Sequence, residues 1–273
     1  MPFVESSGAS IYWDEQGSGA PVLLIAGLGG SSGFWHRIRP ILRGRYRTIA
    51  FDHRGTGQSR AGAPYSIPQM AADAAAVLNA ARINTAHIFG FAMGGMIAQE
   101  FALQYPKKVR SLILGGTSPG GTAAVPPQAD VITVLKSSEH SEQFLSAVNI
   151  LSHVEGTSAQ RVQEDLEVAK KGAPSTEVCA AQIRSMSTWE ACRRIQQLNA
   201  PTLVIHGEND RIVPVENANL LASRIPGAKL KLIARAGHLF LTDQQEASQA
   251  ALLEFLSAQA TRKSERATPV LDR

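Results

Sequence analysis

The longest apolar runs of the chain are short, and several end at glycine or at a polar residue. The first, over residues 21–26, leads directly into Gly27. A predominantly apolar run of this length is typical of a strand that is buried on both faces of a parallel sheet. Residues 11–14 predict an additional, antiparallel edge strand. Apolar runs similar to residues 21–26 predict further buried strands over residues 46–51, 87–91, 109–114, 201–205 and 230–233.

Helical periodicity separates these strands. Residues 66–69 have the pattern of a capping box with proline in the first turn, and apolar residues then recur at helical spacing up to Ala81. Residues 243–246 similarly predict the cap of a final helix that ends near Leu256. Strands that alternate with helices indicate an α/β fold with a doubly wound, mostly parallel sheet. Such a sheet binds its ligands at the carboxyl ends of its strands.

One segment, residues 120–195, interrupts the alternation because it contains no buried strand run. It contains helix-like stretches instead, over residues 143–151 and 161–171. We expect it to form a small helical lid over the edge of the sheet. The predicted domains are a core in two parts, residues 1–119 and 196–260, the helical lid of residues 120–195 between them, and a flexible tail over residues 261–273.

Composition restricts the class of protein. Of the 273 residues, 44% are apolar and 18% are charged, a balance that suits a globular domain with a large core. The net charge is +4, but no stretch interleaves basic with aromatic residues, so nucleic acid is not expected as a partner. No apolar run approaches the roughly 18 residues that span a bilayer, and no secretory signal is visible. These features predict a cytoplasmic protein that does not enter a membrane.

The stretch Gly90–Gly94 follows a predicted strand and precedes a predicted helix. It has the frame of the sharp strand-to-helix turn that presents a catalytic serine, G-x-S-x-G, but Ala92 stands at the place of the serine. A helix that merely began here would favour Ser, Thr, Asp or Asn as its cap. The turn therefore resembles one built for a side chain that is absent. The alternative is a glycine-rich joint that never took part in catalysis.

Two further residues stand directly after strands near the end of the chain. Asp210 follows the strand over residues 201–205, and His238 follows the strand over residues 230–233. The carboxyl ends of parallel strands share one edge of a sheet, so both side chains should approach Ala92. The order of nucleophile position, acid and histidine is that of the α/β-hydrolases. Separately, Asp210 could cap the next helix and His238 could be a turn residue.

Acyl transfer also requires amide hydrogens that face the developing oxyanion. The glycine-rich stretch 27–30 follows the first buried strand, and its Leu28 N–H is one candidate donor. The N–H of Met93, directly after the nucleophile position, is the second. The alternative for residues 27–30 is an ordinary glycine turn.

Other candidate chemistry is excluded by spacing. Residues 52–59 carry charge and glycine at a strand end, and Asp52, Arg54 and Ser59 are expected to tie loops together. The histidines show no metal-ligand spacing, and there is neither a dinucleotide fingerprint nor a P-loop lysine, so no metal and no cofactor is expected. Cys179 and Cys192 suit neither a disulfide framework nor a zinc site, and we expect reduced thiols.

These motifs together make the chain resemble the α/β-hydrolase superfamily over about residues 11–256. The compact lid and the stretch 91–96 are most similar to 3-oxoadipate enol-lactonases, small carboxylesterases and cofactor-free perhydrolases. The sequence departs from the family pattern twice. Ala26 replaces a common histidine before the oxyanion glycine, and Ala92 replaces the nucleophilic serine.

The resemblance implies hydrolysis of a carboxylic ester or lactone. With serine at position 92, the hydroxyl would attack the carbonyl, His238 would move the proton, and Asp210 would orient the imidazole. Our first hypothesis is that this serine was replaced, so that the chain binds substrate without cleaving it. A second hypothesis is a natural binding protein on the hydrolase fold. A third is an enzyme for perhydrolysis or carbon–carbon bond hydrolysis.

The expected partner is a small ester or lactone of apolar or aromatic character. The large apolar side chains near the predicted cleft support this expectation, although some of them could instead pack the lid on the sheet. No arginine can be assigned to a substrate carboxylate, and the sequence carries no signal for oligomeric state. The candidate substrate-binding residues are Gly27, Phe34, Trp35, Phe91, Met186 and Trp189.

Overall fold

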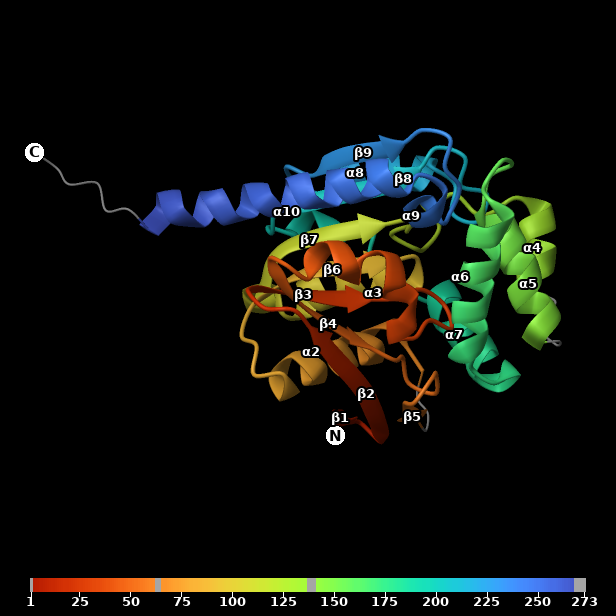
Figure 1. The fold of residues 1–273 in the computed structure, drawn as a ribbon, viewed down its shortest axis with the longest axis horizontal. Helices are drawn as coiled ribbons and strands as arrows, with labels where there is room; N and C mark the ends of the chain where they lie inside the picture. Colours follow the sequence, from red (N-terminus) through yellow and green to blue (C-terminus); the bar gives the residue numbers. More distant parts are fainter. Residues whose placement is uncertain (1, 62–64, 137–140, 268–273) are drawn as a thin grey trace, which may run out of the picture.

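The computed structural model describes residues 2–61, 65–136 and 141–267. Its centre is a sheet with the strand order β1-β2-β4-β3-β6-β7-β8-β9, and β5 pairs with β2 (Figure 1). The strands from β4 to β9 along this path pair in parallel, whereas β1, β2 and β5 join in the antiparallel direction. The strands are β1 Phe3–Ser6, β2 Ala9–Gln16, β3 Ala20–Ile25, β4 Tyr46–Phe51, β5 Arg60–Ala61, β6 Ala86–Phe91, β7 Val109–Gly115, β8 Thr202–Gly207 and β9 Lys229–Ile233.

Each predicted buried strand is present, with ends that differ by at most two residues. Residues 11–14 lie in β2, which is antiparallel as predicted but is not at the edge. The edge on this side is β1, which the sequence analysis missed. Because β1 has only four residues and is largely exposed, it carries no apolar run. Its Phe3 ring instead packs edge-on against Tyr12 of β2.

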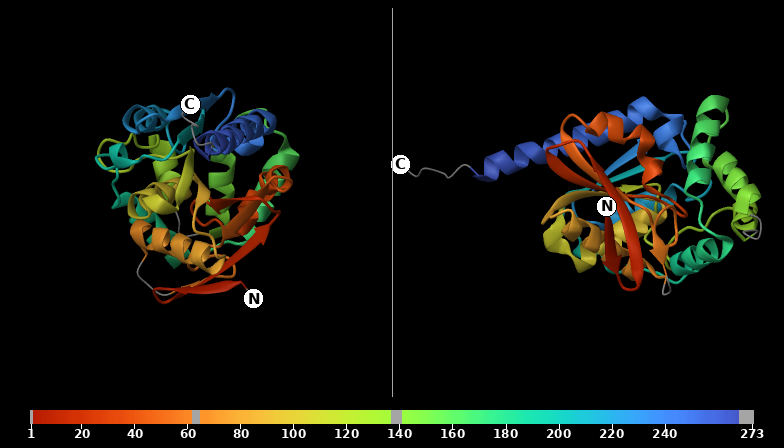
Figure 2. Two further views of the ribbon diagram at one scale, coloured as in Figure 1. Left: turned by 90° about the vertical axis from the view of Figure 1, so that its left-hand side faces the viewer. Right: turned by 60° about the horizontal axis from the view of Figure 1, so that its bottom comes forward.

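Helices cover both faces of the sheet, because successive side chains of a strand point to opposite faces. Leu23 and Ile25 of β3 pack with residues of α2, α3 and α8, whereas Val22 and Leu24 pack with α1, α9 and α10. Figure 2 shows helices on either side of the strands. The fold is therefore the predicted doubly wound α/β sheet. These helices are α1 Arg39–Leu42, α2 Ile67–Ala80, α3 Met93–Gln104, α8 Glu216–Arg224, α9 Phe240–Asp243 and α10 Gln245–Ala267, with 3₁₀ turns at Ser32–Arg37, Pro106–Lys108 and Ile195–Gln197.

The segment predicted as a lid forms a separate group of helices. These helices lie beyond the ends of the strand arrows, at the right of Figure 1. Gly120 and Glu190 form an isolated β-bridge, so the two ends of the insertion lie side by side. The role of this group as a lid stays a prediction. Its helices are α4 Ala129–Lys136, α5 Ser141–Ser152, α6 Ala159–Lys171 and α7 Thr176–Ser187.

The C-terminal helix is longer than predicted. We expected it to stop near Leu256, but α10 continues to Ala267 and projects away from the core (Figure 1). The inward apolar positions that guided the prediction end at Leu256, because the helix leaves the sheet there. The predicted tail of residues 261–273 is thus helical in its first part, and residues 268–273 lie outside the described residues.

Asp243 does not cap α10 as predicted, because it is the last residue of the short helix α9. Its side chain is fully buried. The carboxylate accepts hydrogen bonds from the backbone N–H groups of Val154 and Gly237, at 3.2 and 2.8 Å, and pairs with His153 and Thr157. Asp243 therefore joins the turn between α5 and α6 to the loop that precedes His238.

Of the capping box predicted at residues 66–69, the structure shows the half made by Ser66, and the segment 52–59 ties elements together as predicted. The side chain of Ser66 accepts a hydrogen bond from the N–H of Gln69 and caps α2. In the segment 52–59, the fully buried Arg54 forms a two-bond pair with Asp73 of α2, both at 2.7 Å. Breaking a buried pair of this kind typically costs about 3–5 kcal/mol, so this segment is scaffold.

His87, at the start of β6, makes stability depend on pH. Burial, together with the nearby charge of Arg110, lowers the pKa of His87 to about 4. In the unfolded chain the pKa is about 6.5, so between these values only the unfolded chain binds the proton. The free energy of unfolding should fall by on the order of 3 kcal/mol as the pH decreases from 6.5 to 4. In urea titrations, His87→Gln should remove this part of the pH dependence, and an unchanged dependence would refute the assignment.

Candidate active site

The stretch Gly90–Gly94 forms a sharp turn between β6 and α3. Ala92 has φ 52° and ψ −118°, a conformation that costs a residue other than glycine about 1–3 kcal/mol. A Cβ on Gly90 would overlap the carbonyl of Gly94, and a Cβ on Gly94 would overlap the carbonyl of Ile25. Both positions therefore require glycine. The geometry is that of the strained elbow which, in hydrolases, presents a nucleophile.

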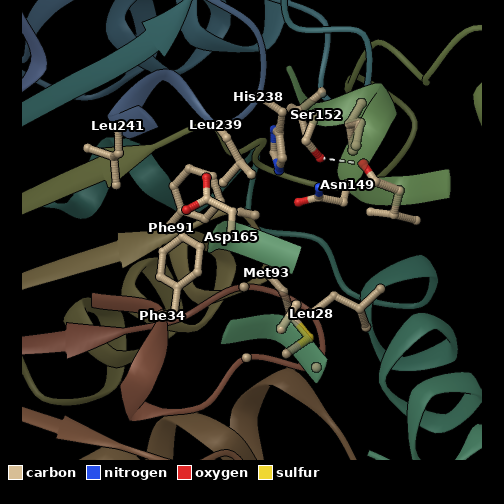
Figure 3. Close-up of a pocket in the computed structure, with 18 of the residues that line it drawn as sticks. Leu28, Phe34, Phe91, Met93, Asn149, Ser152, Asp165, His238, Leu239 and Leu241 are labelled. Atoms are coloured by element: carbon tan, nitrogen blue, oxygen red, sulfur yellow. Dashed lines mark hydrogen bonds between the residues drawn. The ribbon is translucent and has the colours of Figure 1, made fainter. Parts of the chain in front are cut away.

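Asp210 and His238 meet at the carboxyl ends of β8 and β9. His238 Nδ1 lies 2.8 Å from Asp210 Oδ2, and both residues are buried. The other carboxylate oxygen of Asp210 accepts the N–H groups of Ile212 and Val213, at 2.9 and 2.8 Å. The His238 ring also lines the cavity that contains Ala92 (Figure 3). The three positions inferred from the sequence thus converge on one site.

His206 is a partner of Asp210 that the sequence analysis missed. Its Nε2 lies 3.0 Å from Asp210 Oδ2 and 2.8 Å from the carbonyl oxygen of Val213. Both neighbours only accept, so Nε2 must carry the proton. Burial alone would raise the pKa of Asp210, but the charge of His238 and hydrogen bonds from His206 and His238 hold it well below its usual range. The carboxylate is therefore charged and its four hydrogen bonds hold it in place.

The glycine-rich loop after β3 lies directly against the elbow. A Cβ on Gly27 would lie 3.2 Å from the Cβ of Ala92, and Leu28 and Met93 line the same cavity. Within the described residues, the hydrogen bonds outside regular elements do not use the N–H of Leu28 or Met93. Both N–H groups thus belong to residues of the cavity wall, and their role as oxyanion donors stays a prediction.

The cavity next to these groups has a volume of about 290 Å³ and a mainly apolar wall. Of the predicted substrate-binding residues, Gly27, Phe34, Phe91 and Met186 line it. The rings of Phe34 and Phe91 lie 5.0 Å apart, and Phe91 lies 4.9 Å from the ring of His238. Figure 3 shows these side chains around one space.

The two tryptophans were predicted wrongly, because neither lines this cavity. Trp35 is fully buried and packs under the sheet, with its ring 4.8 Å from that of Phe89. Trp189 donates its indole N–H to Glu100 of α3 at 2.8 Å. Both therefore hold elements together, since the turn that carries each of them directs the ring toward the sheet or α3 rather than toward the cleft.

The insertion contributes wall residues that the sequence analysis did not name. On α5 they are Leu145, Val148, Asn149 and Ser152, whose helical spacing is the signal that could have identified them. Asp165 of α6 also borders the cavity. Its carboxylate accepts from Thr242 at 2.5 Å and pairs with His36 and Arg37 of the core. Further wall residues of the insertion are Val125, Pro127, Val168 and Ala169.

Two further features bear on metal binding and on membrane insertion. Among the described residues, no group of three or more His, Cys, Asp or Glu side chains is arranged to hold a metal ion. Within the same part of the chain, every helix is too short or too polar to cross a membrane.

Replacement of Asp210 by asparagine should change the tautomer of His238. The N–H groups of Ile212 and Val213 require an oxygen at one side-chain position, so the NH₂ group must face His238. His238 Nδ1 must then accept, and its proton moves to Nε2. Nitrogen-15 NMR of the histidine rings should show this exchange in Asp210→Asn, with the His87 signals unchanged. A proton that stays on Nδ1 would contradict the arrangement.

Comparison with known sequences identifies a family and several relatives. The family described as serine aminopeptidase, S33, matches residues 17–245. A protein of Azorhizobium caulinodans, provisionally named carbamate hydrolase RutD, is 31% identical over 88% of this chain and 92% of its own. A poly(3-hydroxyalkanoate) depolymerase of Ectopseudomonas oleovorans is 29% identical over 89% of this chain and 86% of its own.

Solved structures support the fold. An esterase from Exiguobacterium antarcticum superposes with a TM-score of 0.84, at 24% identity, over 93% of this chain and 98% of its own. The enol-lactonase from Burkholderia xenovorans superposes with a TM-score of 0.83, at 20% identity, over 94% of this chain and all of its own. The chain therefore belongs to the S33 serine aminopeptidase family of the α/β-hydrolase superfamily.

Proposed function

We propose that this chain is a hydrolase-type protein for small carboxylic esters or lactones, whose carbonyl carbon lies beside Ala92 and His238. The observation that carries the proposal is the hydrogen bond between His238 and Asp210 in the cavity that also holds the elbow. A general base oriented by a carboxylate is the part of an acyl-transfer site with the most demanding geometry. The Leu28 and Met93 amides would hold the carbonyl oxygen.

The methyl group of Ala92 closes the covalent route. Loss of a triad serine lowers turnover by about 10⁶-fold in a comparable enzyme, roughly 8 kcal/mol of barrier. An oxyanion hole and binding alone retain on the order of 10³-fold catalysis over water. We therefore propose that the chain holds an intact ester or lactone for long periods, and that any cleavage uses water deprotonated by His238.

The conformation of Ala92 supports the hypothesis that serine is the residue this turn was built for. The positive φ costs energy, which a methyl group does not return through any polar contact. In an elbow with serine, the same φ aims the hydroxyl at the substrate. The intact pair of Asp210 and His238 fits the same interpretation.

The cavity supports an apolar substrate of modest size. About 290 Å³ is at the small end of ligand pockets, and the rings of Phe34 and Phe91 form part of its wall. We propose a short acyl or alkyl group, or a single ring, on the substrate.

Carbamate hydrolysis is a second candidate, in which the chain acts with alanine in place. A relative at 31% identity is provisionally named a carbamate hydrolase. A carbamate carbonyl needs no covalent intermediate if His238 deprotonates a water molecule beside it. The methyl group of Ala92 is smaller than the side chain of serine, which favours a water molecule at this place.

Ala92→Ser tests the first proposal. With the base and the oxyanion donors in place, hydrolysis of p-nitrophenyl butyrate and of a simple lactone should increase by at least about 10³-fold, measured as kcat/KM. Ala92→Gly, which adds no oxygen, should remain at the starting rate, and so should Ala92→Ser combined with His238→Ala. No gain in the serine form would refute ester and lactone hydrolysis at this site.

The unsubstituted chain tests the second candidate. If water is the nucleophile, the chain should release p-nitrophenol from an N-methyl carbamate, and His238→Ala should lower that rate by about 10²–10⁴-fold, the usual contribution of a general base. Equal rates for the two proteins would refute it. Faster bromination of monochlorodimedone by the serine form, in acetate and peroxide, would instead indicate perhydrolysis.

A further inference from the structure

The insertion reaches the oxyanion loop through one side chain, that of Gln182. Gln182 lies on α7 and is fully buried, although its amide group is polar. The side-chain oxygen accepts the backbone N–H of Gly29 at 2.8 Å, across 153 positions of sequence. The side-chain nitrogen donates to the hydroxyl of Thr56 at 3.3 Å. Both ends of the buried amide therefore bind core loops.

Gly29 is the residue directly after the predicted oxyanion donor. The N–H of Gly30 donates to the carbonyl of Gly27 at 3.0 Å, which closes a tight turn with Leu28 and Gly29 at its centre. Gly29 has φ 63°, as the third position of one common turn type requires. The N–H of Gly29 takes no part in that turn. The bond to Gln182 therefore holds the Leu28–Gly29 peptide group from outside.

This peptide group is the one that rotates when a turn exchanges between its two commonest forms. The group is bonded to the Cα of Leu28, so its rotation would change the ψ angle of Leu28, a residue that lines the cavity. Two neighbouring contacts restrict the same loops. A Cβ on Gly29 would lie 3.2 Å from Pro174, and the carbonyl of Gly172 accepts the N–H of Gly57 at 3.1 Å. The segment before and within α7 thus contacts the loop of residues 27–30 at Gly29 and the segment 52–59 at Thr56 and Gly57.

We propose that Gln182 is a positioning residue, which fixes the Leu28 amide in the orientation that stabilises an oxyanion. Gln182 does not itself line the cavity, so it acts through Gly29. This inference rests on the proposed function, because it assigns a role in acyl transfer. It gives the insertion a part in catalysis besides covering the cleft.

Substitution in the Ala92→Ser protein tests the role in catalysis. Gln182→Met keeps the length of the side chain but removes the acceptor, and kcat should fall about 10–100-fold while KM changes less than about threefold. Gln182→Glu keeps an oxygen for Gly29 and can accept from Thr56, so it should recover most of the lost kcat. Gln163→Met, on the exposed face of α6, is the matched control and should leave both constants unchanged.

Amide hydrogen exchange tests the contact in the unsubstituted chain, without a substrate. In Gln182→Met the Gly29 N–H should exchange at least about tenfold faster, because it loses its partner, whereas the buried Leu24 N–H of β3 should not change. Gln182→Glu should keep the protection of Gly29.

The outcomes separate the two proposals. If the Ala92→Ser protein hydrolyses esters but Gln182→Met keeps its kcat, only the positioning role is refuted. The role is also refuted if Gln182→Met and Gln182→Glu lose kcat equally and both lower the Tm, since that result indicates packing alone. If the Ala92→Ser protein hydrolyses nothing, the proposed function fails and the catalytic role fails with it.

Discussion

The site depends on how closely the first turn of α3 approaches the strands beside it. Gly90 and Gly94 leave no room for a Cβ, because the backbone of the turn contacts that of β3 and its own helix. This close packing forces residue 92 into a positive φ and sets it against Gly27 of the neighbouring loop. The elbow and the loop of residues 27–30 are therefore held together by close contacts of their backbones.

Buried carboxylates hold the remaining parts in place. Asp210 accepts four hydrogen bonds, two of them from histidines, so its charge is compensated where water is largely excluded. Asp243 and Asp165 play a similar part between the core and the insertion, through the loop before His238 and through Arg37. Separation of such a carboxylate from its partners would leave a buried charge unpaired, which is costly. These contacts therefore restrict how the insertion can move.

Two other contacts join the insertion to loops beside the cavity. Gln182 contacts the loop that carries Leu28, and the carbonyl of Ser152 accepts the N–H of Leu239, next to His238. A change in the insertion would therefore reach the loop that carries Leu28 as well as the turn that carries His238. Replacement of its helices by others would change the wall of the cavity and, through these contacts, the positions of Leu28 and His238.

The sequence by itself determined the parallel sheet, the elbow and the order of Ala92, Asp210 and His238. These follow from local patterns, since buried strands are continuous apolar runs and parallel strands end at one edge. Only the tertiary structure decided that Trp35 and Trp189 turn away from the cavity, because an apolar ring suits the core and a cleft equally well.

Only the tertiary structure also decided which polar groups pair with His206, Gln182 and Asp243. Each makes bonds that are set by where the chain returns in space, up to 153 positions away for Gln182. Periodicity reports which side chains are buried, whereas the pairing of polar atoms depends on distances between elements that no local pattern contains.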